Sequence, residues 1–426
     1  MNRLPNHADT IVIGAGITGL CLARSLATQG VSVALLEAAG APGGLLAPKL
    51  LNGVSVDSYY HHIFVSDLRT RRLLDGLDLT RALAWRTTSV SLLDEAGFHP
   101  LTSPLDILRF KELSLGEKVR LALLVRHARS IEPAGLDDVL ARKWAVSLAG
   151  PVVWERFLRP LVEAKFGAAA PRVSAAWLAG RIGCRSNRGL RGERLGYLTP
   201  SFHALVSRLA GDLEPVLWCS EPVEGIVIEG GRVTAVSAGT QTVTCRDVVF
   251  TGGANALAKI LAGMDDLLPD LASLAFQGIL CGVFAVDSPS RGAYWTNVTV
   301  PGAPFNIVVQ QDLLEPVKGG RGIVYASRYV DPETARAAHR ERELDAMQEG
   351  LRAYFGIDPS AISDRELAVT DDAGIVYATG TRAVIDSLRP SVSGFHVAGM
   401  LTSFPDRSIE QSVAGAEDLA RALAGA

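Results

Sequence analysis

The chain has 426 residues, too many for one ordinary hydrophobic core, so we expect at least two domains. Hydrophobic residues make up 48% of it and charged residues 20%, and both values are typical of globular proteins. The formal net charge of −3 indicates no nucleic-acid partner, because such binding usually depends on a basic surface.

A strand, a glycine-rich turn and a helix are predicted in this order at the start of the chain. The β-branched run at residues 10–13 is typical of a buried parallel strand, and the residues after the turn have a helical composition. Gly14, Gly16 and Gly19 allow a tight turn, a close backbone approach and close packing of helix on strand. A second apolar run leads to Glu37, whose carboxylate can accept hydrogen bonds from ribose hydroxyls and would repel a 2′-phosphate. Together these features predict a dinucleotide site with its phosphates at the helix N-terminus, and they disfavour NADP.

The next part of the chain changes from extended to helical. Residues 45–66 contain an extended piece, rich in aromatic residues and histidine, between Asp57 and Phe64. From about 68 to 211 the pattern is mainly helical, with prolines between the segments. The helices predicted from the spacing of apolar residues cover residues 105–130, 136–148, 152–165 and 201–210.

The second half of the chain is predicted to be mainly β-structure. A small meander around a Glu-Gly-Gly turn is followed by a buried strand. These strands are expected at residues 223–228, 232–236, 242–245 and 247–251. A second β-rich block covers residues 277–329, and a long charged helix covers residues 331–355. A strand at 394–399 and a helix at 409–423 close the chain.

Segments typical of nucleotide binding thus occur at the start, middle and end of the chain. This order predicts an α/β fold in which a discontinuous Rossmann-like domain carries an inserted α+β substrate domain. We assign residues 1–67, 212–265 and 387–426 to the nucleotide-binding domain. In this interpretation residues 68–211 form a mainly helical insertion, and residues 266–386 form the β-rich substrate domain.

The cysteines bear on disulfides, metals and cellular location. The chain has five, scattered and without a C-x-x-C spacing, which argues against a disulfide framework and against a zinc or other metal site. No apolar stretch of roughly 18 residues occurs, and no apolar leader precedes the glycine-rich motif. We therefore expect a cytoplasmic protein without a transmembrane segment, and the sequence gives no indication of its oligomeric state.

Four segments spread along the chain form a recognisable set. The glycine-rich motif is followed by the pair Gly43-Gly44. Val223 begins the meander, and Val248-Val-Phe-Thr251-Gly-Gly follows it. Val397-Ala-Gly399 and Ser408-Ile-Glu-Gln-Ser-Val stand near the end. Together these segments resemble the FAD-dependent amine oxidase and protoporphyrinogen oxidase-like superfamily, which includes UDP-galactopyranose mutase, and the resemblance implies an amine oxidase-like two-domain flavoprotein.

The resemblance also implies which residues bind FAD. In the superfamily the last helix begins beside the flavin pyrimidine, and Ser408 and Gln411 here form an S-x-x-Q capping box at its start. The helix N-terminus would stabilise negative charge on the reduced flavin by roughly 0.3–2 kcal/mol. The superfamily often has Gly-Asp where this chain has Gly399-Met400, and no cysteine near residues 399–412 offers a covalent link. The implied FAD-binding residues are Gly14, Ala15, Gly16, Ile17, Thr18, Gly19, Glu37, Ala38, Gly43, Gly44, Leu45, Val223, Thr251, Gly252, Gly399, Met400, Ser408 and Ile409.

His62 and Tyr60 are the first candidates on the substrate side. His62 begins a His-x-Phe element similar to one near the flavin in the mutase branch, where an imidazole can bind the flavin or move a proton. Alternatively the imidazole only caps a strand.

Alternation along a strand would place Asn306, Val308 and Gln310 on one face, either as a pocket wall or as solvent-facing amides of a half-buried sheet. The candidate catalytic residues are His62, Tyr60, Asn306 and Gln310.

Basic residues give weaker indications. A run of arginines could attract an anionic substrate, such as a nucleotide sugar or a carboxylate, or could belong to a solvated loop. The run comprises Arg181, Arg185, Arg188, Arg191 and Arg194. Further, weaker candidates are Lys165, Tyr325, Arg328 and Tyr329, but the sequence alone does not place them. The basic amphipathic stretch at residues 118–129 fits either a membrane surface or a helix packed on the insertion.

Three functions are compatible with these features. The first is a FAD-dependent oxidoreductase that dehydrogenates a small molecule at a C–N or C–C bond. The second is a non-redox mutase or isomerase acting on a nucleotide sugar, favoured by the His-x-Phe element and disfavoured by Gln310-Gln311, where related sugar enzymes carry a different polar run. The third is a flavin-binding protein without catalysis, for which Met400 in place of the usual acid is the only support.

Overall fold

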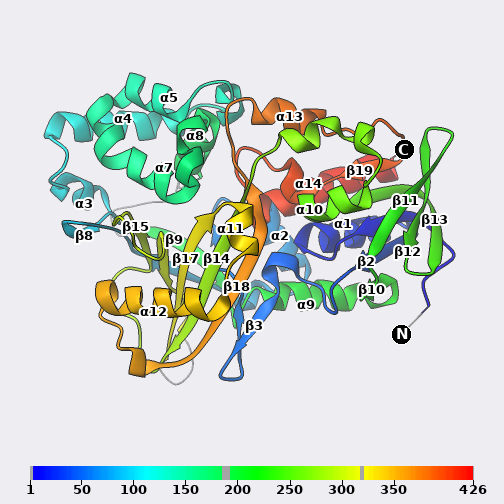
Figure 1. The fold of residues 1–426 in the computed structure, drawn as a ribbon, viewed down its shortest axis with the longest axis horizontal. Helices are drawn as coiled ribbons and strands as arrows, with labels where there is room; N and C mark the ends of the chain where they lie inside the picture. The colour runs from blue at the N-terminus through cyan, green and yellow to red at the C-terminus, as the bar shows by residue number, and fades with distance from the viewer. Residues whose placement is uncertain (1–2, 185–191, 317–320, 426) are drawn as a thin grey trace.

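The computed structural model describes residues 3–184, 192–316 and 321–425, and contains two seven-stranded sheets with helices packed around them. Both termini lie at the end of the molecule that is built on the first sheet, whereas the second sheet lies between a group of helices and α12 (Arg340–Phe355) (Figure 1). The predicted α/β fold, a Rossmann-like domain with an α+β insertion, is confirmed.

The first sheet joins the start, middle and end of the chain. β1 (His7–Ile13) lies between β2 (Val33–Glu37) and β13 (Gln241–Phe250) and is parallel to both. β13 also pairs in parallel with β19 (Phe395–Val397), so the closing strand completes the parallel part of the sheet. The other strands are β10 (Leu217–Cys219), β11 (Val223–Glu229) and β12 (Arg232–Ala238). The expected meander is formed by β11, β12 and the start of β13.

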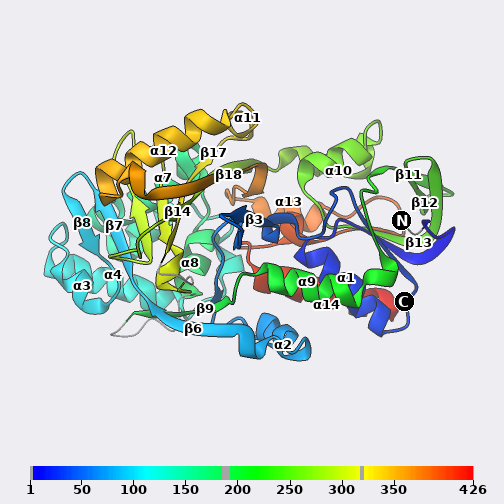
Figure 2. The same ribbon diagram turned by 90° about the horizontal axis from the view of Figure 1, so that it is seen from below.

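Two helices from opposite ends of the chain pack against each other beside this sheet. α1 (Ile17–Thr28) follows the glycine-rich turn, and α14 (Ile409–Ala424) lies next to it in both ribbon views (Figures 1 and 2). α9 (His203–Asp212) also packs against α1. The buried side of α14 includes Ala416 and Ala420, whose small side chains allow the helices to approach closely.

The second sheet is mainly antiparallel. β14 (Phe276–Val286) lies between β18 (Ile362–Ile375) and β17 (Gly322–Val330). At the other side of the sheet, β7 (Val90–Asp94) pairs in parallel with β15 (Trp295–Val298). The sheet is completed by β16 (Ile307–Gln310) and β8 (Gly97–Pro100).

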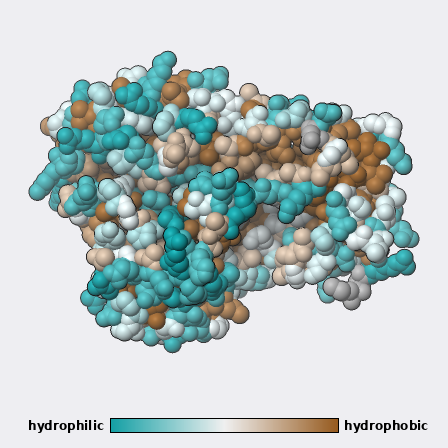
Figure 3. Space-filling view, in the orientation of Figure 1, coloured by the Kyte–Doolittle hydropathy of each residue, from teal (hydrophilic) through white to brown (hydrophobic). Residues whose placement is uncertain are grey.

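Helices cover the second sheet on both sides. α12 buries Leu344, Met347 and Leu351 against a separate apolar core that contains Phe284 and Phe305. Its outer surface is mainly hydrophilic (Figure 3). The helices of the insertion are α3 (Pro104–Arg109), α4 (Leu115–Ala128), α5 (Ala141–Ala149), α6 (Pro151–Val153), α7 (Arg159–Phe166) and α8 (Ala175–Gly183). The remaining elements are β3 (Pro48–Leu51), β4 (Val54–Asp57), β5 (Ile63–Phe64), α2 (Leu68–Gly76), β6 (Leu83–Thr88), β9 (Glu193–Leu198), α10 (Ala254–Ile260), α11 (Pro332–Arg336) and α13 (Thr381–Ser387).

Several elements differ from their predicted boundaries. The helix predicted at residues 105–130 is two helices, α3 and α4, because a second capping box at Ser114 starts α4. The helix predicted at 331–355 is also two, α11 and α12. The strands predicted at 242–245 and 247–251 form the single strand β13, which runs from the meander into the parallel part of the sheet.

The two sheets draw their strands from two different sets of segments. Strands of the first sheet come from residues 1–67, 212–265 and 387–426. Strands of the second come from residues 266–386 and, through β7 and β8, from the otherwise mainly helical segment 68–211. We propose that the domain boundaries follow this division, with both intervening segments in one substrate domain.

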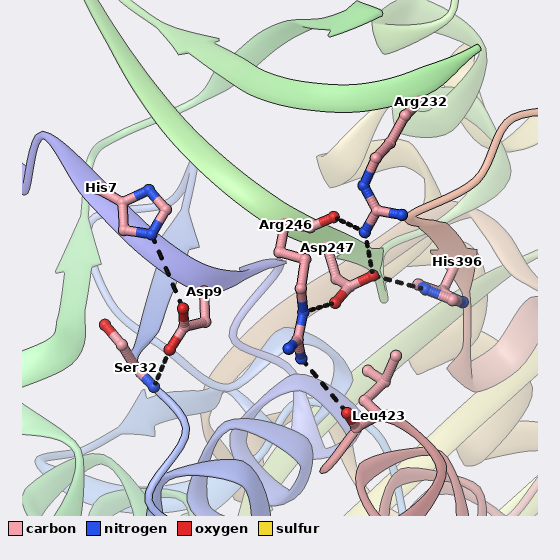
Figure 4. Close-up of polar contacts among 8 residues, drawn as sticks. All are labelled: His7, Asp9, Ser32, Arg232, Arg246, Asp247, His396 and Leu423. Atoms are coloured by element: carbon pink, nitrogen blue, oxygen red, sulfur yellow. Dashed lines mark hydrogen bonds and ion pairs between the residues drawn. The ribbon is translucent and has the colours of Figure 1, made fainter. Parts of the chain in front are cut away.

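A polar network ties the middle and the end of the chain together at the first sheet (Figure 4). The carboxylate of Asp247 accepts a hydrogen bond from Arg246 Nε at 2.8 Å, and His396 Nε2 and Arg232 Nη2 lie 3.4 Å and 3.5 Å from it. Arg246 also donates to the carbonyl of Leu423 in α14 at 3.4 Å. Burial works to raise the pKa of Asp247, but the hydrogen bonds from His396 and Arg246 hold it below its ordinary value.

We expect Asp247→Asn to lower the free energy of unfolding by about 1–3 kcal/mol at neutral pH, because the neighbouring cations lose an ionised acceptor. Since the pKa of Asp247 is depressed in the folded chain, its contribution is present above the ordinary carboxyl pKa and is lost as pH falls through the lower folded value. Urea unfolding should therefore show a difference between the two proteins that shrinks in acid. Glu95→Gln, at an exposed position, is the control, and a difference that stays constant in acid would contradict the assignment.

Candidate active site

A cavity of about 1610 Å³ is lined by residues of both sheets and of helices α3, α4, α7 and α8. One end lies against the glycine-rich turn and the start of α14, and the other lies among the helices of the insertion. Fifteen of the eighteen residues predicted to bind FAD line it. They are Gly14, Gly16, Ile17, Thr18, Glu37, Ala38, Gly43, Gly44, Leu45, Val223, Thr251, Gly252, Met400, Ser408 and Ile409.

The glycine-rich turn is shaped by close backbone contacts. Gly14 has a φ of +101°, a conformation that favours glycine. A Cβ on Gly19 would lie 1.9 Å from the carbonyl oxygen of Gly14, so α1 can pack this closely only with glycine at that position. A Cβ on Gly16, by contrast, would meet nothing within 4 Å. The N–H of Gly43 donates to the Ala15 carbonyl at 2.9 Å, which holds the glycine pair beside the turn.

Glu37 ends β2 and is held by backbone groups. Its Oε2 accepts a hydrogen bond from the N–H of Ala15 at 2.7 Å, and its Oε1 accepts one from the N–H of Ala39 at 2.8 Å. The side chain also lines the cavity. Because each carboxylate oxygen can accept more than one hydrogen bond, Glu37 keeps acceptor capacity for hydroxyl groups of a ligand.

The closing segment meets the turn from the other side. Gly399 has a φ of +87°, and a Cβ there would lie 3.0 Å from Thr18 Oγ1, so it packs behind the cavity wall. Ala15 and Gly19 also lie outside the lining. Ser408 Oγ accepts a hydrogen bond from the N–H of Gln411 at 3.1 Å, which is the serine half of the predicted capping box. Because Ser408 and Ile409 both line the cavity, the N-terminus of α14 faces it.

Of the four candidate catalytic residues, Tyr60 and His62 line the cavity, whereas Asn306 and Gln310 do not. The amide of Gln310 donates to two backbone carbonyls of the 291–293 loop, each at 2.8 Å. Val308, between them, packs in the core beneath α12, while Ile307 lines the cavity. The strand alternation was correct in principle, but the predicted set lies on the face turned away from the cavity.

Histidines and aromatic side chains form the cavity wall near the second sheet. The Nδ1 of His62 is 3.2 Å from the hydroxyl of Tyr294, and its ring packs edge-on against Trp295. His61 is different, because burial lowers its pKa to about 4 and its Nδ1 donates to the carbonyl of Tyr59 at 2.7 Å. His61 is therefore neutral and serves to hold the backbone.

A lysine and two tyrosines lie together on the substrate side. Lys165 Nζ is 4.0 Å from the centre of the Tyr329 ring, and the hydroxyls of Tyr329 and Tyr60 are 3.5 Å apart. Burial alone would raise the pKa of Tyr329, but the charges of Lys165 and Arg407 lower it to about 7. Burial and the neighbouring Tyr329 hold the pKa of Tyr60 well above its ordinary value. Tyr329 is thus the hydroxyl of this pair that loses its proton first.

Two of the five arginines of the predicted run, Arg181 and Arg194, are among the described residues, and their contacts differ. Arg181 lines the cavity and lies 3.4 Å from the carboxylate of Asp406, whereas Arg194 lies over the ring of Trp85. Arg185, Arg188 and Arg191 are outside the described residues. Asp406 and Arg407 line the cavity but were not predicted, although their position just before the Ser408 cap was an available signal.

We expect tyrosinate absorbance in the near ultraviolet to increase as pH rises through about 7, because Tyr329 ionises there. Lys165→Met removes the cation with the larger effect on this pKa and should move the transition toward the ordinary tyrosine pKa of about 10. Tyr329→Phe should abolish it, and Tyr354→Phe, on α12 away from the cavity, should leave it unchanged. A wild-type chain without tyrosinate absorbance below the ordinary range would contradict the assignment.

Comparisons with known proteins agree with this architecture. The model of the family described as flavin containing amine oxidoreductase matches residues 17–424. No curated protein sequence matches the chain. Within the described ranges, every helix is too short or too polar to cross a bilayer.

Solved structures with the same fold include a protein from Exiguobacterium sp. 255-15 provisionally assigned as a protoporphyrinogen oxidase, with a TM-score of 0.79, 18% identity and 98% of each chain covered. Wild-type putrescine oxidase bound to putrescine gives 0.74 and 15%, with 99% of each chain covered. Reduced UDP-galactopyranose mutase gives 0.76 and 16%, covering 98% of this chain and 96% of that one. The predicted resemblance is confirmed. The chain therefore belongs to the flavin-containing amine oxidoreductase family and is a FAD-dependent oxidoreductase.

Proposed function

We propose that FAD occupies the part of the cavity next to the first sheet, where the residues fit its chemical groups. The open space beside Gly16 and the free N–H groups at the start of α1 suit a pyrophosphate. The acceptor capacity of Glu37 suits a ribose. The N-terminus of α14, capped by Ser408, suits the electron-rich edge of the flavin pyrimidine.

We propose further that the enzyme oxidises a small molecule at a C–N or C–C bond. The observation that carries this proposal is that the same cavity continues past the cofactor residues to Tyr60, Lys165 and Tyr329. When bound, FAD supplies the acceptor for the hydride. Apolar side chains such as Leu161 and Trp177 exclude water from this region.

Tyr329 is the group best suited to take the proton that the substrate releases. It is ionised near neutral pH because Lys165 and Arg407 stabilise the phenolate. Tyr60, whose hydroxyl stays protonated, can donate a hydrogen bond to that phenolate or to the substrate. His62 is fixed beside Tyr294 and orients the cavity wall.

A nucleotide-sugar mutase is the second candidate function. The fold of reduced UDP-galactopyranose mutase is similar to this one, and the His-x-Phe element does lie at the cavity. Against it, Gln310 and Gln311 are buried, and the Gln310 amide donates its hydrogen bonds to backbone carbonyls.

A cytoplasmic location stays a prediction from the five cysteines, all of which are unpaired in this structure.

The cofactor position predicts different effects for two glycines of one turn. Gly16→Ala should leave the stability of the apoprotein unchanged, because its Cβ enters open space, and should weaken FAD binding by about tenfold or more, because that space holds the pyrophosphate. Gly19→Ala should lower the stability of the apoprotein by about 3 kcal/mol or more through its clash with Gly14. Apoprotein melting and FAD titration measure both effects. Equal FAD affinity in Gly16→Ala and wild type would rule out this placement.

The reaction class can be tested with the yellow holoenzyme under anaerobic conditions. A substrate of an oxidoreductase should bleach the flavin absorbance, and an acceptor such as oxygen should restore it. A mutase would instead be active only after chemical reduction of the flavin and would leave its absorbance unchanged. We expect bleaching, with a rate at least about tenfold lower in Tyr329→Phe. Turnover only in the reduced state would favour the mutase.

A further inference from the structure

Three cationic side chains line the substrate end of the cavity. Lys165 from α7, Arg181 from α8 and Arg407 before α14 all line it. All three residues are half-buried, and the Arg181 side chain is 31% exposed. The nearby carboxylate is Asp406, which lies 3.4 Å from Arg181. Asp372 also lines the cavity and interacts electrostatically with Arg407, while its Oδ2 accepts a hydrogen bond from the N–H of Ala254. Glu37 is used by backbone groups.

Arg407 is the least compensated member of this group. Among the described residues, no hydrogen bond or ion pair involves its guanidinium, although Tyr329, Asp406 and Asp372 interact with it electrostatically. A charge enclosed in protein is costly unless it is paired, because it has lost its hydration. The planar guanidinium matches carboxylate and phosphate oxygens with two parallel hydrogen bonds. An oxyanion would therefore complete this group.

The cavity beyond the basic group is mainly apolar. Lys118 and Arg129 also belong to its lining, but most of the lining from the insertion is formed by apolar side chains. They include Ile107, Val125, Phe157, Leu158, Leu161, Val162, Trp177, Leu178 and Ile182. A ligand that fits both parts has an anionic group at one end and an apolar body.

We propose that the substrate of this enzyme is an apolar acid whose carboxylate or phosphate binds Arg407, Lys165 and Arg181, with its apolar body between α4, α7 and α8. This inference rests on the proposed oxidation and names the substrate class for it. It also explains specificity, because a small cationic amine placed beside three cations would be repelled. Oxidation then occurs on a substrate held through its acid group.

Binding to the oxidised holoenzyme tests this without turnover. The flavin absorbance is followed during titration with four ligands of equal chain length, namely decanoate, decyl phosphate, decanol and decylamine. We expect decanoate or decyl phosphate to bind at least about tenfold more tightly than decanol, and decylamine to bind least tightly. The tighter of the two anions identifies the head group. Equal binding of acid and alcohol, or tightest binding of the amine, would overturn the proposal.

Variants connect this preference to the basic group. Arg407→Met and, separately, Lys165→Met should each weaken binding of the preferred anion by about tenfold and leave decanol binding unchanged. Arg407→Lys should restore part of the loss. Arg126→Met, an exposed change on α4, is the matched control and should have no effect. A changed flavin reduction potential with unchanged anion affinity in Arg407→Met would show that the charge serves the flavin, and would overturn the proposal.

These outcomes separate the substrate class from the reaction class. If amines bleach the flavin anaerobically while anions do not bind, the proposed oxidation stands and the acid substrate is wrong. If anions bind through Arg407 but no acid of a broad panel bleaches the flavin, the binding site stands and the proposed oxidation fails.

Discussion

The packing of α1 onto the glycine-rich turn is the constraint on which the rest of the site depends. Gly19 lies so close to the Gly14 carbonyl that no side chain fits between them. This contact fixes the direction of α1, and α14 packs on α1. The cavity therefore forms where the first turn, the end of β2 and the start of α14 meet, although these segments lie at opposite ends of the sequence.

The substrate side is assembled in the same way, from residues that are far apart in the sequence. Tyr60 follows β4, Lys165 lies on α7, Tyr329 lies near the end of β17 and Arg407 precedes α14. No single segment carries a motif for this group. The lowered pKa of Tyr329 results from burial, because the charges of Lys165 and Arg407 act on it where water screens them weakly. The cofactor residues, by contrast, work mainly through backbone shape.

This difference decides what could be predicted from the sequence. The glycines and Glu37 were recognisable because their role follows from local spacing. Asn306 and Gln310 were misplaced because alternation shows which residues share a face, but not which face α12 covers. β18 was missed because its sequence, from Ile362 to Ile375, mixes charged and apolar residues, and its pairing with β14 exists only in the folded sheet. Arg407 belongs to no periodic pattern, so the sequence did not indicate it. Of the three functions compatible with the sequence, membership of the family excludes only the flavin-binding protein without catalysis.

The pairing of β13 with β19 has a consequence for biosynthesis. The sheet that opens the chain gains its last strand from residues 395–397, so a nascent polypeptide cannot complete this sheet until residue 397 has left the ribosome. Until then the edge of β13 that receives β19 is unprotected, and exposed strand edges promote aggregation. The domain that begins first is thus completed last, after the whole substrate-binding region has been synthesised.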